Sequence, residues 1–125
     1  MTDHSQFREA VEREDFAALE ATLSEGVHFR SPVVFAPYEG RDAVGALLRV
    51  VGEVIGPALK YQWQVRGGDR EVLCFRTEVD GREVEGVDLL RYGDDGLVAE
   101  LVVMMRPLSA LHAVRDAIGA RLATP

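Results

Sequence analysis

Asp88 is the residue of this sequence whose type and setting most suggest chemistry. It lies in the run GVDLL, residues 86–90, which has the alternation of a β-strand. In such a strand Val84, Gly86, Asp88 and Leu90 share one face. A carboxyl group on an apolar strand face is unfavourable unless it is protonated or hydrogen-bonded. Asp88 is therefore either a pocket acid that donates or accepts a hydrogen bond, or a structural Asp bonded to backbone or water.

Ser31 is a second candidate, because it precedes Pro32 in GVHFRSPVVFAPYEGRDAV, residues 26–44, a stretch typical of the lip of a small pocket. Its hydroxyl could contact a ligand. A serine before a proline can equally well just end a strand. In either case a serine hydroxyl cannot act as a base at neutral pH unaided.

The other residues that could do chemistry do not form a known site. His4, His28 and His112 have no metal-ligand spacing, and a hairpin turn explains Asp94 and Asp95 in GDDG. The sequence contains no P-loop, GxGxxG, GxSxG or CxxC motif. We therefore expect no metal site and no cofactor.

Composition and charge argue against several classes of protein. The 125 residues fit a single domain spanning 1–125. The net charge of −7 disfavours nucleic acid and anionic membrane surfaces as partners, since phosphate binding needs a basic face. No apolar run approaches the ~20 residues of a membrane span. The polar N-terminus and the lone Cys74, a buried structural thiol by its strand position, lead us to expect a cytoplasmic protein.

Helical periodicity predicts the elements that frame these residues. Apolar residues at helical spacing indicate two short helices within residues 4–24, a long helix over 41–55 and a closing helix over 108–122. We expect Asp15 to cap the second helix and Gly26 to end it.

Strand periodicity predicts the rest of the fold. A short strand is expected at residues 27–30, and from Leu59 onward the apolar period is two. Turn sequences separate the later strands: GGD at 67–69, DG at 80–81 and GDDG at 93–96. These features predict an antiparallel meander of four strands. Helices segregated from an antiparallel sheet indicate the α+β class, with a cone-shaped curved antiparallel sheet wrapped around the long helix.

The last strand of the meander is apolar on both faces. Val98, Val102 and Met104 share one face, and Leu101, Val103 and Met105 the other. Both faces of such a strand must be covered by other parts of the protein. The interior of the cone is one cover, and the closing helix or a second subunit is the other. We expect a homodimer through the outer face of the sheet.

This order of elements resembles the nuclear transport factor 2-like superfamily, which includes ketosteroid isomerases and SnoaL-like polyketide cyclases. The resemblance rests on FREAVEREDFAALEATLSEGVHFRSPV, on EGRDAV opening the long helix, and on VDGREVEGVDLLRYGDDGLVAEL. It extends to about Pro107 and implies that the final helix is an addition. The fold hosts isomerases, cyclases, dehydratases, hydrolases and proteins without catalysis, so it does not by itself give a function.

The resemblance also assigns roles to three positions. The isomerase uses a carboxylate base, a tyrosine and an aspartic acid whose raised pKa keeps it protonated. By resemblance the base falls on Ser31, the tyrosine on Phe7 and the acid on Asp88, so one role of three is kept. A missing proton acceptor removes roughly 10² to 10⁴ in rate, so ordinary ketosteroid isomerase activity is not expected. The epoxide hydrolase branch of the superfamily has an arginine at the position of Gly86, so the resemblance does not support that activity.

A set of apolar residues is expected to surround Asp88, by alternation and by resemblance. Phe29, Phe75, Leu90, Leu101 and Met105 would line the pocket together with Phe7 and Ser31, and Tyr61 and Trp63 would form its floor. Each of these residues could equally belong to the hydrophobic core and line no pocket.

The sequence leaves two classes of function open. The first is a site that binds a small apolar ligand and catalyses isomerisation, cyclisation or dehydration by proton transfer, without metal, through Asp88. The second is a non-catalytic ligand-binding or dimeric interaction module.

Overall fold

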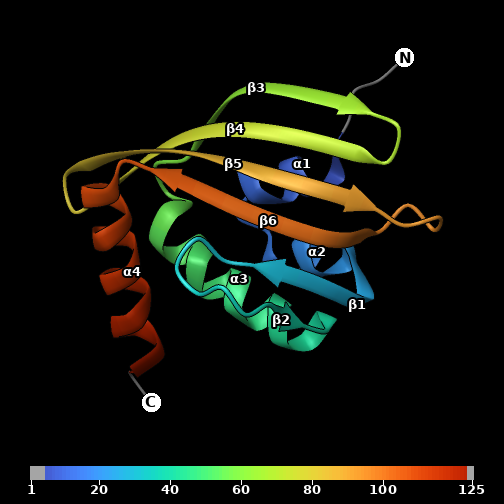
Figure 1. Cartoon of the computed structure of the whole chain (residues 1–125), viewed down its shortest axis with the longest axis horizontal. Coiled ribbons are helices and arrows are strands. Elements are labelled where there is room, and N and C mark those ends of the chain that lie inside the picture. Colours follow the sequence, from blue (N-terminus) through green and yellow to red (C-terminus); the bar gives the residue numbers. More distant parts are fainter. Residues whose placement is uncertain (1–4, 124–125) are drawn as a thin grey trace.

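The long helix expected over residues 41–55 is α3 (Arg41–Ile55), and the sheet curves around it (Figure 1). The computed structural model describes residues 5–123. Before α3 come α1 (Gln6–Glu12), α2 (Phe16–Ala21), β1 (Leu23–Arg30) and the two-residue β2 (Tyr38–Glu39). After it come β3 (Lys60–Gly67), β4 (Arg70–Val79), β5 (Arg82–Tyr92), β6 (Val98–Arg106) and α4 (Leu108–Ala123). His4 lies outside the described residues.

The six strands form one curved sheet in the order β2-β1-β6-β5-β4-β3. The α+β cone and the antiparallel meander β3–β6 are confirmed. One pairing differs from the expected antiparallel sheet, because β1 runs parallel to β6, with Phe29 opposite Leu101. The sheet is therefore mixed. The crossover that a parallel pair requires is provided by α3 and the meander between them.

Side-chain caps explain where the two short helices begin. Ser5 Oγ accepts a hydrogen bond from the backbone N–H of Arg8 at 3.2 Å, and Asp15 Oδ1 accepts one from Ala18 at 3.0 Å. The cap predicted at Asp15 is thus confirmed. The stop predicted at Gly26 is wrong, since α2 ends at Ala21 and Gly26 lies inside β1. The apolar side chains of residues 23–29 support a strand because α3 covers one face of β1.

A β-bulge in β3 changes which side chains face inward. Tyr61 pairs with Phe75, but the next registered pair is Trp63 with Cys74, so one residue is inserted between them. An inserted residue reverses the alternation beyond it. Trp63 therefore turns outward and is 50% exposed, against the prediction that it forms the floor of the pocket with Tyr61. Val65 also lies on the outer face and is 60% exposed. Gln64 takes the inward place.

The core lies between the concave face of the sheet and the helices. Leu23, Phe29, Leu73, Phe75, Leu90 and Leu101 are among its fully buried side chains. In Figure 1 α1, α2 and α3 lie behind the sheet, and α4 crosses its left-hand end. Val114 of α4 is fully buried and borders the same internal space as Leu101, so α4 packs on the concave side. It is not the cover of the outer face.

Candidate functional site

A cavity of about 240 Å³ lies between the concave face of the sheet and all four helices. Most of its wall is apolar. Among the apolar side chains that form it are Phe7, Phe16, Leu19, Phe29, Leu48, Val51, Leu101, Val103, Met105, Val114 and Ile118. Its volume lies just below the roughly 300–1,000 Å³ of sites for drug-sized ligands.

Seven of the residues named from the sequence border this cavity: Phe7, Phe29, Ser31, Tyr61, Asp88, Leu101 and Met105. Three do not. Trp63 is turned outward by the bulge in β3. Leu90 and Phe75 are each 1% exposed and lie in the packed core. Phe75 fills the space that Gly86 leaves free and meets the Tyr61 ring edge-on, with ring centroids 6.4 Å apart.

Asp88 and Tyr61 form a hydrogen-bonded pair on the cavity wall. The Tyr61 hydroxyl donates to Asp88 Oδ2 at 3.3 Å, although the residues lie on β5 and β3, with β4 between them. Phe75 lies between them on β4, and its ring occupies the space that a side chain at Gly86 would fill. The sequence placed Tyr61 on the inner face but gave no sign that its hydroxyl reaches Asp88.

Burial shifts the protonation of both groups. Asp88 is only 7% exposed, and burial raises its pKa to about 7, while the hydrogen bond from Tyr61 acts in the lowering direction. Burial, followed by the charge of Asp88, raises the pKa of Tyr61 well above its usual range. The Arg8 guanidinium lies 5.0 Å from the centroid of the Tyr61 ring. At neutral pH Asp88 is therefore available as donor and as acceptor, and Tyr61 stays a hydroxyl.

Ser31 has a structural role in the loop that follows β1. Its Oγ accepts hydrogen bonds from the backbone N–H groups of Val33 at 3.0 Å and Val34 at 2.9 Å. These bonds satisfy the hydroxyl oxygen and shape the turn. Phe7 is 4% exposed and offers only its ring.

Within residues 5–123, the charged side chains that border the cavity are Asp88, Glu14 and Arg115. The last two are exposed, and we call the exposed border of the cavity to which they belong the rim.

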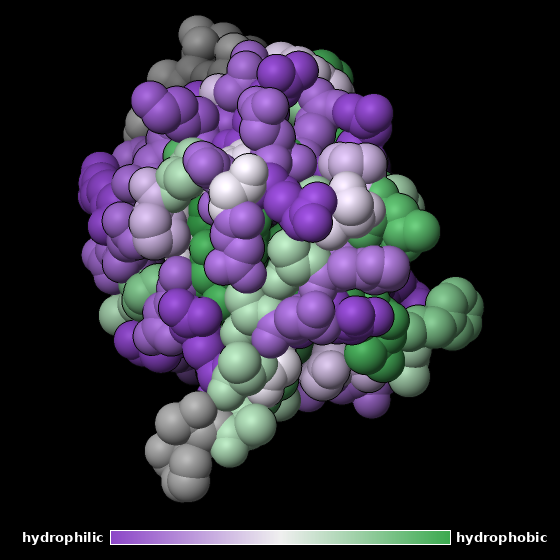
Figure 2. All heavy atoms as spheres, turned by 90° about the vertical axis from the view of Figure 1, so that its left-hand side faces the viewer, coloured by the Kyte–Doolittle hydropathy of each residue, from purple (hydrophilic) through white to green (hydrophobic). Residues whose placement is uncertain are grey.

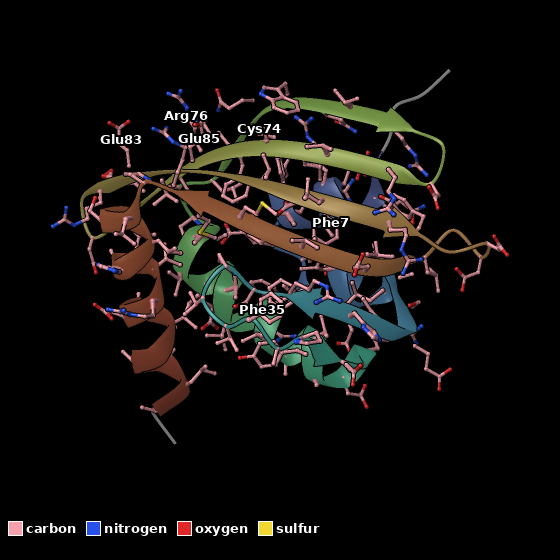
Figure 3. The ribbon with its side chains drawn as sticks, in the orientation of Figure 1. Phe7, Phe35, Cys74, Arg76, Glu83 and Glu85 are labelled. Atoms are coloured by element: carbon pink, nitrogen blue, oxygen red, sulfur yellow. The ribbon has the colours of Figure 1, made fainter. Side chains whose placement is uncertain are left out.

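Hydrophobic side chains are also exposed near the rim. Val33 and Val34 border the cavity and are 41% and 44% exposed, and the neighbouring Phe35 is 94% exposed. Figure 3 shows Phe35 on the loop that joins β1 to β2, whereas Phe7 lies behind the sheet. Figure 2, which looks onto the side where α4 lies, shows hydrophobic residues in a hollow between polar ones.

A second buried carboxylate, which the sequence did not single out, lies away from the cavity. Glu71 is 1% exposed and accepts hydrogen bonds from Tyr92 Oη at 2.6 Å, Ser5 Oγ at 3.0 Å and Gln64 Nε2 at 3.0 Å. Three donors compensate for the burial of the carboxylate. The cluster fastens the start of α1 to the sheet. Glu71 alternates with Leu73 and Phe75, so strand alternation could have identified it as buried.

Two features bear on cofactors and membranes. The described part of the chain has no group of three or more His, Cys, Asp or Glu side chains arranged to hold a metal ion. His28 lies 3.3 Å from Glu39, and neither it nor the exposed His112 borders the cavity. None of the helices within residues 5–123 has the length and hydropathy needed to cross a membrane.

Comparison with solved structures finds the same fold in several proteins, two of which are 34% identical to this chain. An uncharacterised protein with a cystatin-like fold from Silicibacter pomeroyi DSS-3 is 34% identical, with a TM-score of 0.90 over 95% of this chain and 84% of that one. A steroid delta-isomerase from Pseudomonas aeruginosa is also 34% identical, with a TM-score of 0.89 over 94% of this chain and 87% of that one. A ketosteroid isomerase-like structure from Kribbella flavida shares the fold at 16% identity, with a TM-score of 0.68 over 82% of this chain and 73% of that one.

The family comparison covers the part of the chain that holds Asp88. A search of curated proteins found no match. The family model of the SnoaL-like domain matches residues 4–101, which excludes α4. By this match and by the shared fold, the chain belongs to the SnoaL-like family of the nuclear transport factor 2-like superfamily.

Proposed function

We propose that the cavity binds a small, largely apolar molecule that carries a carbonyl group, and that Asp88 transfers a proton beside that carbonyl. The observation that carries this proposal is the Tyr61–Asp88 pair, whose donor and acceptor oxygens are 3.3 Å apart in an otherwise apolar wall. A pKa of about 7 suits proton transfer, because a catalytic group works best when its pKa lies near the working pH. The cavity volume of about 240 Å³ favours a ligand smaller than a typical drug.

The pair supports a simple proton cycle. Ionised Asp88 accepts a proton from the carbon next to the carbonyl, which leaves an enolate, and neutral Asp88 then returns the proton to the same or to another carbon. Return to another carbon is an isomerisation. The Tyr61 hydroxyl, by donating to Asp88, stabilises the ionised form that starts the cycle. The cycle needs no metal or nucleotide.

Exchange of protons for deuterium tests the chemistry without knowledge of the natural substrate. Cyclohexanone in deuterated buffer loses its α-proton signal in ¹H NMR when a catalyst removes those protons. The wild type should speed this loss above buffer, and Asp88→Asn should return it to background. Asp94→Asn, an exposed turn residue away from the cavity, is the matched control and should behave as wild type. Equal exchange by wild type and Asp88→Asn would refute the assignment.

A second candidate function is ligand binding without catalysis. The position that the superfamily resemblance gives to the base holds Ser31, whose oxygen is occupied by two backbone N–H groups. Binding of cyclohexanone with no exchange above buffer would support this alternative.

We also propose a homodimer through the outer face of the sheet. Val87, Leu89 and Val102 are half-buried in its centre, and Met104 is 54% exposed. Ion pairs border this centre, because Glu85 lies 3.1 Å from Arg106 and 3.5 Å from Arg76. Figure 3 labels Arg76 and Glu85 next to each other at the left-hand end of the sheet. An apolar centre with a charged border is the usual anatomy of an interface.

The dimer is tested by mass in solution. Light scattering on a sizing column should give twice the chain mass of 13.8 kDa for wild type and a single chain for Met104→Asp. A wild-type monomer at micromolar concentration would refute the dimer.

A cytoplasmic location is proposed from the single cysteine, which allows no internal disulfide, and cell fractionation tests it.

A further inference from the structure

Glu14 occupies a backbone position that normally favours glycine. It follows α1, where the N–H of Glu14 donates to Val11 O and the N–H of Asp15 donates to Ala10 O, both at 3.0 Å. This pair of bonds ends the helix with Glu14 in the left-handed region, at a φ of 53°. A residue with a Cβ is disfavoured there relative to glycine. The sequence thus places a side chain where the backbone alone would select against one.

The carboxylate of Glu14 lies at the rim, beside the end of α3. Glu14 borders the cavity, and a Cβ built on Gly56 would be 3.6 Å from Glu14 Oε1. Gly56 ends α3, so the carboxylate adds a negative charge to the negative end of the helix dipole. The last turn of α3 contains no basic residue. This part of the rim therefore has a negative potential that favours a cation.

The charges around the rim do not neutralise Glu14. Arg115, the cation that borders the cavity, contacts Asp116 at 3.0 Å. Arg121 of α4 lies 3.7 Å from Glu53 on α3. Within residues 5–123 the Glu14 side chain has no hydrogen bond or ion pair. The carboxylate is therefore free to pair with a cationic group of a bound molecule.

We propose that the molecule bound in the cavity is an amino ketone: its carbonyl group lies at the buried Tyr61–Asp88 pair, and its protonated amine lies at the rim against Glu14. This inference rests on the proposed function and narrows it to a substrate class. Asp88 is buried and Glu14 is exposed, so the two groups select for opposite ends of one molecule. An apolar body joins the carbonyl and amine ends of the ligand, because most of the cavity wall is apolar.

Two ketones of the same skeleton test the amine preference. Tropinone is a bicyclic amino ketone that is protonated at neutral pH, and bicyclo[3.2.1]octan-3-one replaces its nitrogen bridge by carbon. Titration calorimetry should show that wild type binds tropinone about fivefold more tightly at low salt, the upper range for an exposed ion pair. Salt should reduce this ratio because it screens exposed charges. Glu14→Gln should bring the ratio to about one and leave the affinity for the neutral ketone unchanged.

A second variant separates recognition from folding. Glu14→Gly should raise the melting temperature, since glycine suits the backbone there, and should also abolish the preference for tropinone. Glu25→Gln, which removes an exposed charge from β1 away from the cavity, should change neither property. A preference that persists in Glu14→Gln, or its absence in wild type when the neutral ketone still binds, would overturn this inference alone. Failure of both ketones to bind wild type would overturn the proposed function and this inference with it.

Discussion

Replacing Asp88 by asparagine should change how the stability of the protein depends on pH. Burial raises the pKa of Asp88 to about 7, whereas an aspartic acid in an unfolded chain has a pKa of ~3.9. Between these two values the folded protein holds a proton that the unfolded chain has released. The free energy of unfolding contributed by this group is therefore greatest below the lower value, falls as the pH rises, and is constant again above the higher one. Asparagine cannot ionise but still accepts the hydrogen bond from Tyr61, so the variant lacks this dependence.

The size of the effect follows from the two pKa values. Each unit of separation is worth ~1.36 kcal/mol, so stability should fall by about 1.4 kcal/mol for each pH unit in the steep region. Between about pH 5 and about pH 8, the difference in unfolding free energy between wild type and Asp88→Asn should fall by about 2.5 kcal/mol. Most of this change should be complete by pH 7, because Asp88 is then about half ionised in the folded state. The variant should be the more stable protein at the upper end.

Urea denaturation at a series of pH values measures this difference. Subtracting the two curves removes the titration of all groups that wild type and variant share, so the remainder belongs to Asp88. A carboxyl carbon NMR titration gives the midpoint directly. A difference that does not change with pH, or that grows as the pH rises, would mean that the folded pKa is at or below ~3.9. Asp88 would then be a charged, hydrated or paired carboxylate, and the proposed proton transfer would lose its basis.

Three further results are expected. Tyr61→Phe should raise the pKa of Asp88 above about 7 in the same NMR titration, because the lost hydrogen bond favours the ionised form; an unchanged or lower value would contradict the pair. Glu71→Gln should lower the urea-derived unfolding free energy by roughly 1–3 kcal/mol, since three donors then face a side chain with a single acceptor oxygen; a neutral result would refute the cluster's structural role. With Ser31 and Phe7 in place, an ultraviolet assay for the conjugated enone should detect no isomerisation of a β,γ-unsaturated ketosteroid above background, and fast turnover would refute this reading of both positions.

Much of the fold can be predicted from the sequence because its signals are local. The helix over residues 41–55 has a long apolar stripe, and its observed bounds are the expected ones. The turn at Asp80-Gly81 likewise joins β4 to β5. The parallel pairing of β1 with β6 has no local signal, because it joins residues about seventy positions apart. Only the packing of the whole sheet around α3 decides it.

The same distinction between local signals and long-range packing applies to the candidate site. Alternation along β5 predicts that Asp88 faces inward, and the structure places it there. The contact between Asp88 and Tyr61 depends on the register of three strands at once, since Tyr61 pairs with Phe75 and Phe75 with Gly86. The bulge that turns Trp63 outward occurs in YQWQV without a glycine or proline to mark it. Such shifts arise from sheet curvature, which a short stretch of sequence does not encode.

The arrangement of polar groups in the cavity limits the chemistry that this chain could perform. Phe7 offers no hydroxyl, but Tyr61 brings one to Asp88 from a different element, so a tyrosine–carboxyl pair is present all the same. The oxygen of Ser31 is held by backbone N–H groups, so nothing at that position can accept a proton from a ligand. If protons move in the cavity, Asp88 must be both the acceptor and the donor, and a pKa near neutrality is the property that such a double role requires. A pKa of Asp88 near neutrality is therefore a condition for catalysis, and exchange of the α-protons decides between a catalytic site and a binding site.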